Sequence, residues 1–129
     1  MTAWVKQGSK ESIGIITDFV DPGLTKYMLK LVDEYTEIKA VETKCGYACS
    51  DHASWLRVGV PSAFTIESTF EDSNHKCATT LPSPDPPLTA SCSIHSGNDR
   101  IDYSPKEFSF EHMRQFSRLV CAMVLELAT

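Results

Sequence analysis

Apolar residues in the first part of the chain follow two different spacings. Residues 12–20 form a short β-branched run, which is typical of a buried strand. The Asp-Pro-Gly sequence at residues 21–23 breaks this run. From Leu24 to Tyr35, apolar residues then recur three or four positions apart, which predicts an amphipathic helix with one apolar face.

Two more strands and a short helix are expected in the middle of the chain. Residues 38–44 and 61–68 are predicted strands, and apolar and polar side chains alternate in the second of them. A short helix is expected between them, capped by Ser50 or Asp51 and running toward Gly59. Strands that alternate with helices indicate a layered α/β fold.

The longest helical pattern lies at the end of the chain. The Ser-Pro-Lys-Glu sequence at residues 104–107 resembles a capping box with proline at the first helical position. We expect the following helix to bury a broad apolar face, together with the thiol of Cys121. The residues of this face are Phe110, Met113, Phe116, Leu119, Val120, Met123, Val124 and Leu127.

The charge balance excludes some classes of partner. The chain has 129 residues, with 12 Lys+Arg against 17 Asp+Glu and a formal net charge of −5. An acidic chain without a basic run lacks the electrostatic footprint of nucleic-acid binding. Its longest apolar run, Leu119–Leu125, is too short to cross a bilayer. Residues 1–6 do not resemble a signal peptide, and the length suits one small domain.

Two cysteines four positions apart are the first candidates for chemistry. The spacing of Cys45 and Cys49 allows a small disulfide loop, in which Gly46 eases the tight backbone. It also allows two zinc ligands, with His52 as a third, or two unlinked core thiols. No fourth ligand stands at a spacing typical of zinc sites, so a structural zinc has little support.

The histidines identify no site by spacing alone. His95 follows Ile94 in a polar stretch, where a histidine can act as a metal ligand or as an acid or base, although ordinary solvation explains it as well. His52 stands next to Asp51, which suits a buried, hydrogen-bonded imidazole. His112 is expected to have a structural role near the start of the last helix.

A long motif is far more specific than these single residues. The string CGYACSDHASW at residues 45–55 closely resembles the secreted di-zinc leucine aminopeptidases of bacteria and fungi. The similarity continues through residues 59–68 and 94–95 and into the last helix. It covers essentially the whole chain except residues 77–93.

The resemblance implies both a fold and a reaction. The fold is a three-layer α/β zinc-exopeptidase fold, in which helices flank a mixed β-sheet. The reaction is the release of apolar N-terminal residues, such as leucine, from peptides and proteins outside the cell. Two Zn²⁺ ions bridged by a carboxylate and a water polarise the first peptide carbonyl, and a glutamate acts as general base.

The resemblance also assigns residues position by position. His95 matches a zinc ligand, and Cys45 and Cys49 match a disulfide pair. Asp51 and His52 belong to the motif and are expected to support the site from outside the ligand shell. The positions expected to line the apolar substrate pocket, which ordinary core packing would also explain, are Ile16, Tyr47, Phe64, Ile66, Phe70 and Ile94, with Met1 as a further candidate.

Most of the metal ligands of the family have no counterpart here. One histidine, the bridging aspartate, a Glu-Glu pair and a further aspartate lie earlier in the family's chain than the position of Met1. One imidazole cannot hold two zinc ions, because a catalytic zinc needs about three protein ligands. We therefore interpret residues 1–129 as the C-terminal portion of a zinc aminopeptidase catalytic domain that lacks its N-terminal half.

This interpretation predicts that the chain alone is inactive and binds no stoichiometric zinc. Its sheet would have open edges and uncovered apolar surface, which favour aggregation. The alternatives are a non-catalytic remnant without zinc chemistry and an unrelated metal-binding module built on Cys45, Cys49 and His52.

Residues 77–93 form an insertion within the family pattern. The segment contains four of the seven prolines, no aromatic residue and one charge, which is typical of a loop or a disordered insert. In the family, the positions of Ile94 and His95 follow almost directly after that of Lys76. Because codons at both ends of the segment can contain intron splice sites, a retained intron is our hypothesis for it, and the cDNA sequence tests it.

Overall fold

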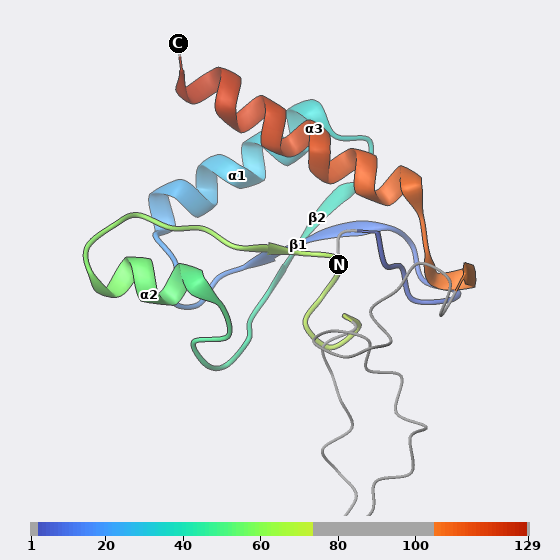
Figure 1. The fold of residues 1–129 in the computed structure, drawn as a ribbon, viewed down its shortest axis with the longest axis horizontal. Coiled ribbons are helices and arrows are strands. Elements are labelled where there is room, and N and C mark those ends of the chain that lie inside the picture. The colour runs from blue at the N-terminus through green and yellow to red at the C-terminus, as the bar shows by residue number, and fades with distance from the viewer. Residues whose placement is uncertain (1–2, 74–104, 129) are drawn as a thin grey trace, which may run out of the picture.

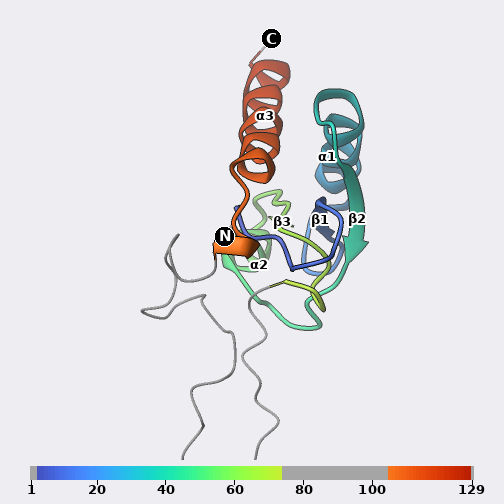
Figure 2. The ribbon, with the colours of Figure 1, turned by 90° about the vertical axis from the view of Figure 1, so that its right-hand side faces the viewer.

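Helices α1 and α3 lie together on one face of a three-stranded sheet, and the short helix α2 lies beyond one end of it (Figures 1 and 2). This computed structural model describes residues 3–73 and 105–128. The elements are β1 (Ser12–Ile16), α1 (Pro22–Tyr35), β2 (Lys39–Thr43), α2 (Asp51–Arg57), β3 (Thr65–Ile66), the 3₁₀ turn η1 (Pro105–Glu107) and α3 (Phe110–Leu127). The predicted α/β class is confirmed.

The sheet is mixed, as expected, and β1 is its central strand. The strand order is β2-β1-β3. Strands β1 and β2 are parallel, from Ser12 opposite Lys39 to Ile16 opposite Thr43, whereas β3 is antiparallel to β1. A parallel pair needs a crossover connection, and α1 provides it. Because β1 has a neighbour on each edge and helices above it, its last four residues are buried.

Two of the predicted strands are too long. β1 ends at Ile16 rather than at residue 20, because Phe19 has a φ of 56°, which an extended strand does not allow. β3 has only two residues, although residues 61–68 were expected to form it. The carbonyl of Phe64 still accepts a hydrogen bond from the Ile16 amide at 2.9 Å. The bounds of α1, β2 and α2 lie within two residues of those predicted.

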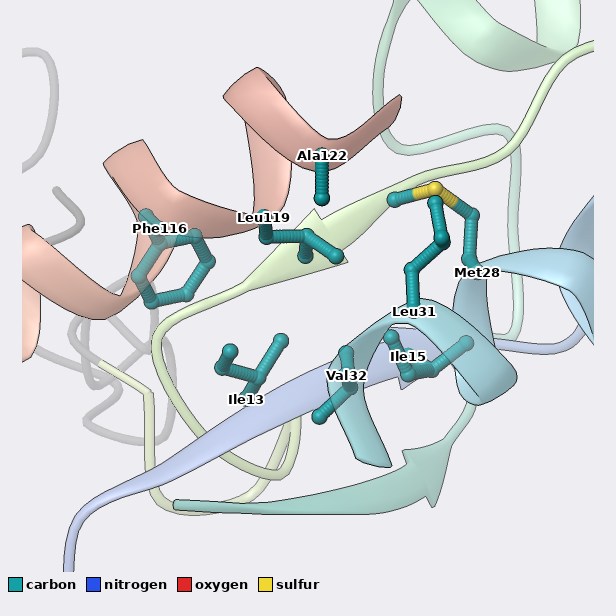
Figure 3. Close-up of a cluster of buried hydrophobic side chains, with 8 residues drawn as sticks. All are labelled: Ile13, Ile15, Met28, Leu31, Val32, Phe116, Leu119 and Ala122. Carbon is teal, nitrogen blue, oxygen red and sulfur yellow. The ribbon is translucent and has the colours of Figure 1, made fainter. Parts of the chain in front are cut away.

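The hydrophobic core lies between β1 and the two long helices (Figure 3). The branched side chains of Ile13 and Ile15 point toward α3, which lies above them in this view, and α1 contributes the remaining side chains. Its eight buried members are Ile13, Ile15, Met28, Leu31, Val32, Phe116, Leu119 and Ala122. Burial of apolar surface of this kind is the main favourable term in folding. The core therefore depends on contacts between the two ends of the described chain.

The start of α3 differs from the prediction. The helix begins at Phe110, and residues 105–107 form a separate 3₁₀ turn instead of its first turn. The N-cap is Ser109, whose hydroxyl oxygen accepts a hydrogen bond from the His112 amide at 3.0 Å and donates one to Glu11 at 2.6 Å. Capping at Ser109 satisfies one of the amides that have no partner within the helix.

The buried face of α3 is also narrower than the prediction. Phe116 and Leu119 are buried as expected, but the thiol of Cys121 is exposed. Other members of the predicted face are exposed as well, namely Phe110, Met113, Val120, Val124 and Leu127. The periodicity shows which residues share a side of a helix, but only one stripe of α3 meets β1 and α1.

Buried polar side chains of α3 fix the helix to its neighbours. The Nε2 atom of His112 lies 2.8 Å from the carbonyl oxygen of Ser12, at the start of β1. Gln115 accepts a hydrogen bond from the Glu37 amide at 2.9 Å and donates one to Glu111 at 2.6 Å. His112 thus has the structural position expected of it.

Replacing Leu119 tests the position of the core. Leu119→Ala is expected to lower the free energy of unfolding by about 2–5 kcal/mol, because it leaves a cavity against β1. The matched control is Val120→Ala on the next residue, which is 60% exposed and should change stability by less than about 0.5 kcal/mol. Chemical denaturation followed by circular dichroism measures both, and equal effects would contradict this packing.

Candidate functional site

The loop that follows β2 is closed by a disulfide. Cys45 and Cys49 are joined with an Sγ–Sγ distance of 2.00 Å. Gly46 has a φ of 82°, in the region that favours glycine, which lets the backbone turn directly after the first cysteine. Of the three arrangements that the spacing allowed, the structure therefore contains the disulfide, and these sulfurs are not zinc ligands. We call residues 45–49 the disulfide loop.

The carboxylate of Asp18 holds the start of the disulfide loop. Its Oδ1 atom accepts a hydrogen bond from the Cys45 amide at 3.0 Å, and its Oδ2 atom accepts one from the Gly46 amide at 2.7 Å. Asp18 lies two residues after the end of β1 and Cys45 two residues after the end of β2, so the parallel register brings both to one end of the sheet. Hydrogen bonds to an ionised acceptor are among the strong ones.

The role of Asp18 could not be found by reading spacing. It is one of several carboxylates in the sequence, and its partners are backbone amides that are separated from it by 27 and 28 positions. The available signal was indirect, since Asp18 lies near the end of a predicted buried strand and Cys45 follows another. Adjacent parallel strands would place these two ends side by side.

His52 lies in the first turn of α2, the helix that follows this loop in the chain. Its side chain is buried, with only 5% of the residue exposed, and its ring stacks on Phe64 at a centroid distance of 4.8 Å. Within the described part of the chain, the backbone of Asp18 interacts with the ring, although neither ring nitrogen has a partner in ordinary hydrogen-bond geometry. The expectation of a buried histidine is confirmed, and the backbone of Asp18, rather than the adjacent Asp51 side chain, is the polar group that acts most strongly on its ring.

Burial determines the charge of His52. Desolvation lowers the pKa of the imidazole below its ordinary value of 6.5, because burial penalises the charged form. Asp18 and Asp51 act in the opposite direction and only partly offset this effect. His52 is therefore a neutral ring at neutral pH, which suits its stacked position against Phe64.

The structure brings several expected pocket residues to the same end of the sheet. The rings of Tyr47 and Phe70 meet edge to face at a centroid distance of 6.2 Å. Ile16 and Phe64 are joined through the backbone hydrogen bond already described. The Phe70 amide donates to the Thr43 hydroxyl at 2.9 Å, which fixes Phe70 beside the end of β2.

The remaining expected site residues either lie away from this end of the sheet or are not among the residues that the structure describes. Ile66 pairs with Gly14 in the middle of β1, away from the strand ends. Gly14 lets the chain cross closely there, because a Cβ atom at this position would lie 1.8 Å from the Ser68 carbonyl oxygen. Met1, Ile94 and His95 fall outside the described residues, as does the insertion at residues 77–93.

The described residues do not form a metal site. Across residues 3–73 and 105–128, no three His, Cys, Asp or Glu side chains are grouped so that they could hold a metal ion. A zinc centre does not fit the donors that this part of the chain supplies. In the same ranges, none of the helices has the length and apolar character needed to span a membrane.

Relatives of this chain are known from sequence. No family model matches it. Proteins named leucine aminopeptidase 1 from Pyrenophora teres f. teres and Leptosphaeria maculans are each 45% identical to it over 132 residues. These alignments cover 99% of this chain but only 28% and 29% of the relatives. The chain is thus homologous over its whole length to leucine aminopeptidases, and spans less than a third of their length.

Solved structures give the same result. The LapA aminopeptidase of Legionella pneumophila is 32% identical, with a TM-score of 0.74 over 99% of this chain and 29% of that protein. LapB from the same organism is 30% identical, with a TM-score of 0.71 over 97% of this chain and 29% of LapB. The α/β arrangement described above is therefore shared with part of these larger proteins.

Weakening the Asp18 carboxylate should loosen the disulfide loop. Asp18→Asn removes the charge and one acceptor oxygen, so amide hydrogen exchange at Cys45 and Gly46 should speed up, and stability should fall by about 1–2 kcal/mol. The matched control, Asp33→Asn, changes an exposed carboxylate of α1 and should leave both amides unaffected. Unchanged exchange in Asp18→Asn would show that the carboxylate does not hold the loop.

His52 should make stability depend on pH. Its pKa is lower in the folded chain than its ordinary value of 6.5, so below that value the unfolded chain binds the proton more readily. This contribution to stability is complete above 6.5 and is lost as the pH falls toward the folded-state pKa. His52→Phe keeps the stacking and removes the titration, so denaturation midpoints between about pH 5 and pH 7 should vary less in the variant. An identical pH dependence in both proteins would contradict a buried neutral imidazole.

Proposed function

We propose that this chain is the C-terminal portion of the catalytic domain of a secreted, zinc-dependent aminopeptidase. The enzyme would release apolar N-terminal residues, such as leucine, from peptides and proteins. The observation that carries this proposal is the 45% identity to a protein named leucine aminopeptidase 1 across 99% of the chain. The motif at residues 45–55 supports it, because its cysteines and the Asp18 carboxylate together order a loop beside two expected pocket residues.

The chain would contribute the apolar part of the substrate site. Tyr47 is 56% exposed at the tip of the disulfide loop, and it touches Phe70, so these rings are available to cover an apolar side chain. Ile16 has no exposed surface and would support the pocket from below without touching substrate. His52 would have the same supporting role for Phe64, on which it stacks.

The metal part of the site would come mainly from other polypeptide. The resemblance gives this chain one zinc ligand, His95, which lies outside the described residues. The described residues add no group of three donors to it. Hydrolysis of a peptide bond is therefore not expected from the 129-residue chain alone.

A chimaeric protein tests the proposal. In leucine aminopeptidase 1 of Pyrenophora teres f. teres, this chain replaces the segment that it matches, with and without residues 77–93. The isolated chain should bind no stoichiometric zinc and release no leucine from leucinamide, whereas the chimaera should do both. His95→Ala in the chimaera should lower turnover by at least about 100-fold, because even residues around a metal ligand change activity by ~10–100-fold. His75→Ala is the control and should have little effect.

Two outcomes would contradict this function. Turnover of leucinamide by the isolated chain would show that it needs no further ligands. A chimaera that folds and binds zinc but releases no leucine would instead favour a non-catalytic remnant.

A further inference from the structure

Helix α3 has a second apolar side that stays largely exposed in the described fold, although the ring of Phe110 contacts that of Phe108 at a centroid distance of 4.9 Å. Its members follow one another at intervals of three, four or seven positions, so they share one side of the helix. Four of them are at least 60% exposed, and Met113 is 37% exposed. We call these residues the outer row: Phe110, Met113, Val120, Val124 and Leu127.

The charged residues of α3 lie away from the outer row. Arg114 pairs with Glu111 at 2.6 Å and with Glu37 at 3.2 Å, and Arg118 pairs with Glu37 at 2.6 Å. The last charged residue of the helix, Glu126, accepts a hydrogen bond from Tyr35 of α1. The four charged side chains of α3 therefore all interact within the helix, with α1, or with Glu37 just after α1. These four residues are Glu111, Arg114, Arg118 and Glu126. The outer row itself carries no charge.

A helix with apolar residues on two sides is typical of a helix packed between two layers. The inner side of α3 already packs on β1 and α1 through Phe116, Leu119 and Ala122. The outer row would need a second layer, and an exposed apolar surface of this kind marks an interaction site. The similar proteins are large enough to supply that layer, because this fold makes up only 28% of the relative from Pyrenophora teres f. teres and 29% of LapA.

We propose that the outer row of α3 is a docking surface for polypeptide equivalent to the part of these relatives that this chain does not match. The inference rests on the proposed function, since it treats the chain as one portion of a larger catalytic domain. The occupant would present an uncharged, apolar surface, because no charge on the outer row is available to pair with it. The α3 helix would then lie between the sheet and the added layer.

The test uses the chain co-expressed with the unmatched part of leucine aminopeptidase 1 from Pyrenophora teres f. teres. A tag on the chain captures the complex, and the amount of partner retained is measured. The double variant Val120→Lys/Val124→Lys should retain roughly tenfold less partner, because two charges would be buried at the contact. The matched control Val58→Lys, at a residue that is 70% exposed beyond α2, should retain a normal amount. Circular dichroism checks that the exposed substitutions leave the fold intact.

Cys121 provides a second readout on the same helix. Its free thiol is exposed and adjoins Val120, so alkylation at this residue, followed by mass spectrometry, reports covering of this part of α3. Alkylation should be roughly tenfold slower in the covalent chimaera than in the isolated chain, because a covered thiol reacts poorly.

Each outcome decides the proposal without reference to activity. A complex that Val120→Lys/Val124→Lys weakens, with slower alkylation of Cys121 in the chimaera, supports docking even if no leucine is released; the proposed function would then fail alone. Equal retention of partner by the double variant overturns docking at the outer row. So does equal alkylation in the chimaera and the isolated chain. Dimerisation of the isolated chain that the double variant abolishes would assign the surface to a second copy instead.

Discussion

The burial of β1 is the constraint on which the rest of the structure depends. The strand pairs on both edges, and Ile13, Ile15 and Ile16 have no exposed surface. Ile13 and Ile15 pack against both α1 and α3, so helices from distant parts of the chain meet on this strand. Its carboxyl end also sets the position of Asp18, and through Asp18 that of the disulfide loop. The packing of one short strand therefore fixes both the fold and the candidate substrate surface.

The sequence was sufficient wherever a local pattern decides the structure. The row from Leu24 to Tyr35 predicted α1, and its Asp21 cap accepts a hydrogen bond from the Leu24 amide at 2.7 Å. The β-branched run at residues 12–20 predicted β1, and residues 38–44 were predicted as the strand that became β2. In α1 and β2, periodicity and breaking residues agree, and the observed ends differ from the predicted ones by a residue or two, whereas β1 ends earlier because the backbone turns at Phe19.

Contacts between distant residues explain what the sequence could not predict. Residues 104–107 match the sequence pattern of a capping box, but the N-cap of α3 is Ser109. The Ser109 hydroxyl also donates a hydrogen bond to Glu11, which directly precedes β1, and this distant contact is not visible in the local pattern. The same holds at the site, where the motif identifies the disulfide loop but does not show that Asp18 holds it. At His52 the adjacent Asp51 suggested the polar partner, whereas the ring stacks on Phe64 and its strongest polar interaction is with the backbone of Asp18.

Two observations on the described residues support the proposal that further polypeptide completes the fold. The outer row of α3 is apolar and largely exposed, and residues 3–73 and 105–128 contain no group of three donors that could hold a metal ion. Exposed apolar surface costs free energy, so a stable protein normally covers it. The disulfide loop, by contrast, is ordered by Asp18 and the disulfide within this chain. Under the proposed function, this chain supplies a preformed apolar surface for the substrate side chain, and the added layer supplies most of the metal chemistry. Substrate preference would then follow this chain in any chimaera, whereas zinc affinity would follow its partner.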